Sequence, residues 1–96
     1  MASDEDPLIR RLREQVSDND VALVEAMNRR LELVGRMWRH KEERGLEVLD
    51  PEREEWMLRY LTRANRGPLS PAGLEELFAT VLELTKRELR RDEPAG

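Results

Sequence analysis

The 96-residue sequence is long enough for one small domain, and its lack of cysteine excludes disulfides and thiolate metal sites. Charged residues make up 40% of the chain but the net charge is only -4, which argues against a general nucleic-acid-binding role. The N-terminus is polar and acidic, unlike a signal peptide, and no apolar run approaches the roughly 20 residues of a membrane span. We therefore expect a cytoplasmic protein that contacts neither membrane nor nucleic acid.

The first predicted element is a long helix from about Pro7 to about Arg44. Proline is absent from residues 8–50, Asp6 suits the N-cap, and Gly45 suits the C-cap. At 1.5 Å per residue this helix would be about 55 Å long. A compact domain of this size has a diameter of only about 32 Å, so one end of the helix must project from it.

The projecting end of this helix is apolar along one side. Its apolar side chains are Ile9, Leu12, Val16, Leu23 and Val24. Water does not tolerate such a stripe, and a second copy of the chain is the simplest cover for it. The residues thus predict a two-fold homodimer.

Two shorter helices follow, and no strand is expected. The second helix begins at Asp50-Pro51 and ends near residues 65–68, where Gly67 can cap it and Pro68 stops it. The third begins at Ser70-Pro71 and runs to about Arg90. The fold class is therefore all-α, with a helical domain over residues 8–90 between tails at residues 1–7 and 91–96.

Charged side chains interrupt the inward-facing positions of the first helix. These positions alternate in steps of three and four, the spacing of a packed helix face: Arg13, Val16, Asp20, Leu23, Met27, Arg30, Val34, Met37 and Lys41. Burying an unpaired cation costs several kcal/mol, so the three cations need anionic partners. Asp20, glutamates of the other helices or a bound anion can supply them. Alternatively, the cations lie at the edge of the face and reach solvent.

The second helix adds a cation and two carboxylates. Arg53 shares a face with Met57 and Tyr60, so it lies on an apolar side, and Asp50 and Glu54 lie one turn apart near the same end. The second helix thus also carries a cation on an apolar side, which adds to the case that carboxylates or a bound anion pair such cations.

The third helix contributes Thr85 and Glu88 to its inner face. A threonine there is commonly satisfied by the backbone of its own helix, and a glutamate there is commonly a rim charge. His40 is the only histidine and sits in a polar run, so a histidine triad or histidine metal site has little support.

These segments together resemble the all-helical (AroQ-class) chorismate mutase family, from about Ile9 to Leu89. The resemblance rests on the order and spacing of LREQV, MNRRLELVGRMWRHKEERG, VLDPERE, NRGPLS and LEELFATVLEL. It implies an enzyme that converts chorismate to prephenate in aromatic amino acid biosynthesis, without cofactor or metal. It also implies an intertwined homodimer in which each active site borrows an arginine from the partner, by position Arg13.

The resemblance assigns roles to the other candidates. Arg30 would bind a substrate carboxylate, and Lys41 would contact a carboxylate and the ether oxygen of the breaking bond. Asp50 and Glu54 would hold the ring hydroxyl, and Arg53 would line the pocket. The substrate is a dianion that rearranges within itself, so positioning and preorganised charge suffice for catalysis.

One position departs from the family pattern. Many members carry a glutamine one turn after the hydroxyl position of the third helix, and here Leu89 falls in that slot if Thr85 is the hydroxyl. Either Thr85 or Glu88 substitutes as a donor, or Lys41 acts alone. The alternatives are an isochorismate-pyruvate lyase or a weakly active regulatory homologue on the same fold, and a non-enzymatic helical dimerisation module. The sequence does not say whether an activating partner enzyme exists.

Overall fold

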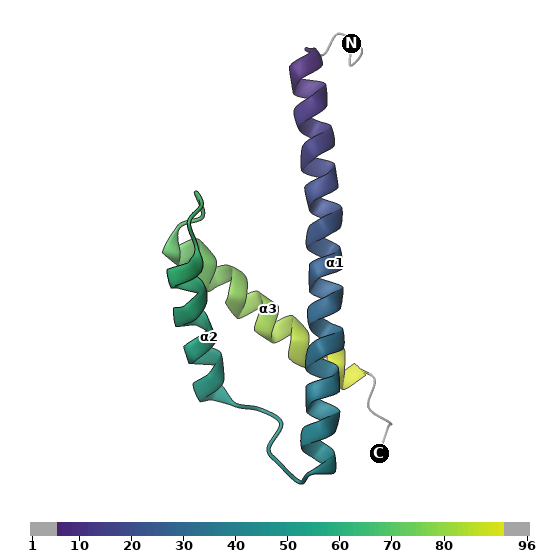
Figure 1. Ribbon diagram of the computed structural model, residues 1–96, viewed down its shortest axis with the longest axis vertical. Coiled ribbons are helices and arrows are strands. Elements are labelled where there is room, and N and C mark those ends of the chain that lie inside the picture. The colour runs from purple at the N-terminus through teal and green to yellow at the C-terminus, as the bar shows by residue number, and fades with distance from the viewer. Residues whose placement is uncertain (1–5, 92–96) are drawn as a thin grey trace. The chain divides into compact units, whose positions relative to one another are not determined.

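The computed structural model describes residues 6–91, with side chains for residues 6–90. Three α-helices follow one another: α1 (Pro7–Glu43), α2 (Pro51–Ala64) and α3 (Pro71–Arg91) (Figure 1). Residues 6–91 contain no strand, so the all-α prediction is confirmed. Helix α1 begins at the last residue of the predicted N-terminal tail, and α3 reaches one residue into the predicted C-terminal tail. Residues 1–5 and 92–96 of these tails lie outside the described residues.

Both ends of α1 form where the sequence predicts. The Asp6 side chain accepts a hydrogen bond from the backbone N–H of Leu8 at 2.7 Å, which caps the N-terminus. At the other end Gly45 has a φ of +70°, the left-handed conformation that favours glycine. The N–H groups of Gly45 and Leu46 donate to the carbonyls of Glu42 and Lys41, the two bonds of a Schellman motif.

The shorter helices also begin at their predicted caps. Asp50 accepts from the N–H of Arg53 at 3.1 Å, and the Ser70 hydroxyl accepts from the N–H of Gly73 at 3.0 Å. The predicted capping role of Gly67 is wrong. The C-cap of α2 is Asn65, whose side chain accepts from the Gly67 N–H and donates to the Leu69 carbonyl. An asparagine amide can hold such a turn, so the glycine does not adopt a positive φ.

The chain divides into two units within α1, Met1–Leu33 and Val34–Gly96. In the first unit, every residue from 6 to 26 is exposed. Its large exposed apolar side chains are Leu8, Ile9, Leu12, Val16, Val21, Leu23 and Val24. Half of the longest helix thus has no apolar cover within the described chain.

The second unit holds the end of α1 together with α2 and α3. Leu74 and Thr85 of α3 are buried, and so is Gly35 of α1. A Cβ at Gly35 would lie 3.4 Å from Cδ2 of Leu89, which is van der Waals contact. Gly35 therefore marks the place where α3 packs against the backbone of α1. No helix in residues 6–91 is long and apolar enough to cross a lipid bilayer.

Candidate functional site

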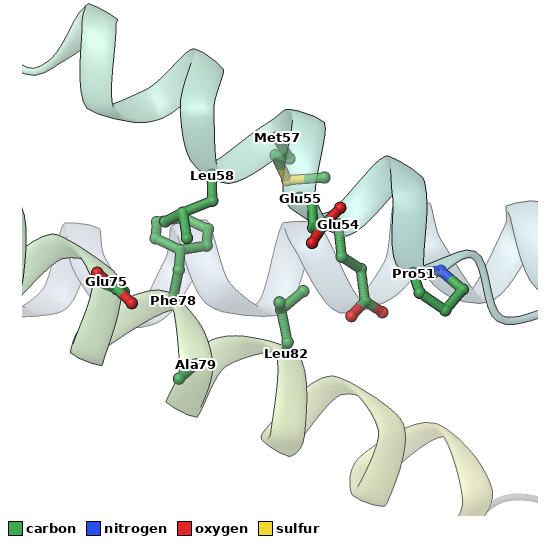
Figure 2. Close-up of a pocket in the computed structure, with 9 residues that line it drawn as sticks. All are labelled: Pro51, Glu54, Glu55, Met57, Leu58, Glu75, Phe78, Ala79 and Leu82. Atoms are coloured by element: carbon green, nitrogen blue, oxygen red, sulfur yellow. The ribbon is translucent and has the colours of Figure 1, made fainter.

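A pocket of about 370 Å³ opens between α2 and α3 (Figure 2). Its apolar lining comes from Pro51, Met57, Leu58, Phe78, Ala79 and Leu82. Figure 2 shows Phe78 and Leu82 of α3 pointing toward α2, with the Phe78 ring beside Leu58. We call this pocket the α2–α3 groove.

The charged side chains of the α2–α3 groove are all acidic. They are Glu54 and Glu55 of α2 and Glu75 of α3, and no cation is among the lining residues. Three carboxylates repel a dianion. The groove by itself therefore suits a cationic, partly apolar occupant rather than a dianionic small molecule.

Lys41 lies at the end of α1, where the following loop folds back over it. The Leu46 N–H donates to the Lys41 carbonyl at 2.8 Å, and Lys41 Nζ donates to the Val48 carbonyl at 3.3 Å. The side chain is half-buried. A cation in this last turn also complements the helix dipole, so Lys41 is both a structural cap and a positioned ammonium.

Asp50 and Arg53 meet at the start of α2 through the N-cap hydrogen bond. The Arg53 guanidinium lies over the Trp56 ring at 4.0 Å, and the Trp56 and Tyr60 rings stack at 5.3 Å. The expected apolar side of Arg53 is not buried within the described chain. Arg53 and Tyr60 are exposed and lie outside the α2–α3 groove, whereas Met57 is half-buried and lines it.

Glu54 is joined to a residue that the sequence did not single out. Lys86 of α3 approaches both of its carboxylate oxygens, with Nζ 3.4 Å from Oε1 and 3.3 Å from Oε2. The side chains of Glu54 and Lys86 are 28% and 33% exposed, respectively. Glu54 therefore links α2 to α3 by an ion pair at the edge of the α2–α3 groove.

The candidate residues of α3 differ in their surroundings. The Thr85 hydroxyl donates to the Val81 carbonyl of its own helix at 2.7 Å, and Thr85 is only 4% exposed. Leu89 contacts the Gly35 region of α1, so the expected glutamine slot holds a packing residue. Glu88 is half-buried. The alternative reading of Thr85, satisfied by its own helix, is confirmed.

The remaining predicted cations belong to the first unit. Arg13 is exposed and Arg30 is half-buried. His40, in the second unit, is exposed as expected of a solvated side chain. Within residues 6–91, no group of three or more histidine, aspartate and glutamate side chains is arranged to hold a metal ion.

Burial separates a few cations from all the others. Among the basic side chains of residues 6–90, Arg30, Lys41 and Lys86 are half-buried and the rest are exposed. Lys41 and Lys86 are also the only two lysines among the 17 basic residues of the sequence. The rarity of lysine was the sequence feature that could have drawn attention to Lys86. Its position on the third helix did not indicate a carboxylate partner.

The three helices and the half-buried cations on them describe a small all-helical protein, and comparison with known proteins identifies its class. The chorismate mutase type II family matches residues 12–89. The Form II structure of chorismate mutase from Thermus thermophilus is 31% identical, with a TM-score of 0.82, and the match covers 90% of this chain and 98% of that one. The Form I structure from the same organism is 34% identical, with a TM-score of 0.78 and coverage of 80% and 96%. No curated protein sequence matches this chain.

The chain therefore belongs to the chorismate mutase type II family. The match extends over nearly all of α1, all of α2 and most of α3, so it includes every candidate site residue from Arg13 to Glu88. The activity for which the family is named makes the chain an enzyme of the isomerase class.

Proposed function

We propose that this chain catalyses the rearrangement of chorismate to prephenate as a homodimer. The observation that carries the proposal is the family match over residues 12–89, together with two half-buried cations on α1, Arg30 and Lys41. An anionic substrate compensates for the cost of holding such cations away from water.

The rearrangement requires the protein to fix the geometry of the substrate and to stabilise developing charge. In chorismate the carbon–oxygen bond of the enolpyruvyl ether breaks while a carbon–carbon bond forms within the same molecule. The protein must hold the side chain folded over the ring, which is a matter of positioning. It must also stabilise the negative charge that develops on the ether oxygen, a task for preorganised cations.

We assign the positioning and the charge stabilisation to different residues. The planar guanidinium of Arg30 suits bidentate binding of a carboxylate, and the ammonium of Lys41 suits a point contact with the ether oxygen. Glu54 and Asp50 accept the ring hydroxyl, and Arg53 leaves the Trp56 ring to add a cation to the pocket. Thr85 and Glu88 lie on the substrate-facing side of α3. The burial of Thr85 and the half-burial of Glu54 and Glu88 support these places.

The dimer in this proposal supplies an occupant for the α2–α3 groove. The exposed first half of α1 carries an apolar stripe and the cations Arg10, Arg11 and Arg13. The groove has an apolar floor and the carboxylates Glu55 and Glu75, together with Glu54, which Lys86 already pairs. The apolar stripe suits the apolar floor, and the three arginines suit the groove's carboxylates, if this end of the partner's α1 lies along the groove. The charge match is confined to residues 10–13, because Glu14, Asp18, Asp20 and Glu25 follow on the same half of α1.

In this arrangement Arg13 of one protomer enters the active site of the other. It adds a cation where the α2–α3 groove has only acidic side chains, which would allow a dianion to bind. The long α1 then serves both chains, because its first half completes the partner's site while Arg30 and Lys41 serve its own.

An assay of chorismate loss with identification of the product tests the activity. We expect prephenate to accumulate without added metal or cofactor. Release of pyruvate from isochorismate, with no prephenate formed from chorismate, would instead indicate a lyase. Turnover of neither substrate would leave a non-enzymatic dimerisation module.

A further inference from the structure

The ion pair between Lys86 and Glu54 has no role in the proposal above. Lys86 continues the row of α3 side chains that faces the α2–α3 groove, since Phe78, Leu82 and Lys86 are spaced by four residues. On α2, Glu54 and Leu58 form the matching row. The ion pair therefore closes the end of the groove that lies beyond Leu82.

The geometry of the pair fixes the carboxylate as well as neutralising it. Nζ of Lys86 lies 3.4 Å from one oxygen of Glu54 and 3.3 Å from the other, so the ammonium sits across both. Both side chains are about two-thirds covered, with exposures of 33% for Lys86 and 28% for Glu54. Water screens such a pair less than a fully exposed one, so its electrostatic effect is stronger than that of a surface ion pair.

We propose that Lys86 is a positioning residue for substrate binding, and this inference rests on the proposed function. It orients the Glu54 carboxylate toward the ring hydroxyl and cancels its charge. Without that cancellation, a glutamate beside the site would repel a substrate that carries two carboxylates. Lys86 thus lets one site hold a hydrogen-bond-accepting carboxylate and a dianion at the same time.

The test is a double-mutant cycle in the full-length protein. Lys86→Met removes the ammonium and keeps the stem, and Glu54→Gln removes the carboxylate charge. We expect Lys86→Met to raise KM for chorismate roughly tenfold and to lower kcat by a smaller factor, because the uncompensated carboxylate opposes dianion binding. In the Glu54→Gln background the same change should have little further effect on KM, because no carboxylate charge remains to cancel. Lys86→Arg should restore most of the affinity.

Arg87 provides the matched control, since it is an exposed cation on the same helix. Arg87→Met changes the net charge equally and should leave both kinetic constants unchanged. A Lys86→Met enzyme that unfolds at a lower temperature but keeps its KM and kcat would show that Lys86 only stabilises the fold. That result would overturn the inference. A KM effect that persists in full in the Glu54→Gln background would also overturn it, because Lys86 would then contact the substrate directly. An inactive wild-type protein would instead refute the proposed function and the inference with it.

Discussion

The two lysines of this chain differ from most of its arginines in burial and in side-chain chemistry. Fifteen of the 17 basic residues are arginines, and most of those in the described part of the chain are exposed. Lys41 and Lys86 are half-buried, and each donates to one defined acceptor. An ammonium is a compact point charge on a flexible stem, whereas a guanidinium is a planar fork that matches a carboxylate. Lysine at these two positions therefore indicates contacts with single oxygens or with one small carboxylate.

Lys41→Ala should lower kcat by at least about 10²-fold, because a donor aimed at developing charge acts mainly in the transition state. Lys41→Arg should also be poor, since a planar fork replaces the point charge. Steady-state kinetics with chorismate, combined with circular dichroism, separate this effect from unfolding.

Arg44, an exposed cation at the same end of the chain's longest helix, is the control for the Lys41 variants. Arg44→Ala should retain wild-type kinetics. The site assignment is wrong if the Lys41→Ala enzyme stays within a few-fold of wild type. Lys41 would then be a helix cap that only stabilises the loop to Val48.

At the scale of the elements, helix ends are fixed by local chemistry. Asp6, Asp50 and Ser70 each cap a helix whose first residue is proline. The C-terminal end of α1 depends on Gly45, which alone among the described residues has a positive φ. The loop that follows it carries Val48, the acceptor for Lys41. The end of α1 therefore supports the candidate site as well as the fold.

Gly45→Ala should destabilise the protein by about 1 kcal/mol, because alanine is strained in the left-handed conformation. The space around a Cβ at this position is open, so backbone strain is the sole expected cause. Gly67→Ala is the matched control, since Gly67 lacks a positive φ and its nearest neighbour, Asn65 Oδ1, is 3.9 Å away. Its effect should stay within about 0.5 kcal/mol. Chemical denaturation at one fixed protein concentration measures both, and equal losses would contradict the argument.

At the scale of the whole molecule, the exposed apolar surface of α1 is the dominant feature. Val16 and Leu23 are 59% and 62% exposed, and other large apolar side chains lie along the same half of the helix. Complete burial of one such side chain contributes roughly 1.5 to 3 kcal/mol, so covering the stripe outweighs the cost of association. We therefore expect a stable fold of this sequence to depend on a second chain.

We expect an obligate dimer that Val16→Glu weakens, because the substitution puts a charge on the covered stripe. Analytical ultracentrifugation should show dimers for the wild type at micromolar concentration and dissociated, less helical protein for the variant. Gln15→Glu adds the same charge beside the stripe and should leave the dimer intact. A fully helical wild-type monomer at micromolar concentration would refute this prediction.

The shared active site is tested by refolding two inactive variants together. Arg13→Ala and Arg30→Ala chains should form mixed dimers with one intact site, with Arg30 from one chain and Arg13 from the other. Mixtures of Arg30→Ala and Lys41→Ala should recover nothing, because in the proposed arrangement both residues serve the site of their own chain. Verified mixed dimers of the first pair without activity would show that Arg13 does not act across the interface.

The three helices could be predicted from the residues alone, because the signals that begin and end a helix are local. Asp6, Asp50 and Ser70 with the prolines that follow them, and Gly45 at the end of α1, act within one helical turn. The order and spacing of five segments, from LREQV to LEELFATVLEL, were enough to predict the family. The sequence also placed Arg13, Arg30 and Lys41 at inward-facing positions of the first helix. Arg30 and Lys41 are half-buried, whereas Arg13 is exposed within the described chain.

Contacts between helices could not be predicted in this way, because they depend on how the helices are rotated against one another. Rotation of α2 against α3 brings Lys86 to Glu54 and leaves Arg53 on Trp56, although the helical pattern alone placed Arg53 on an apolar side. The packing of Leu89 at Gly35 likewise joins residues 54 positions apart. Periodicity fixes which side chains share a face, but not which face meets a neighbour. That choice is made by the packing of all three helices and, in our proposal, by a second chain.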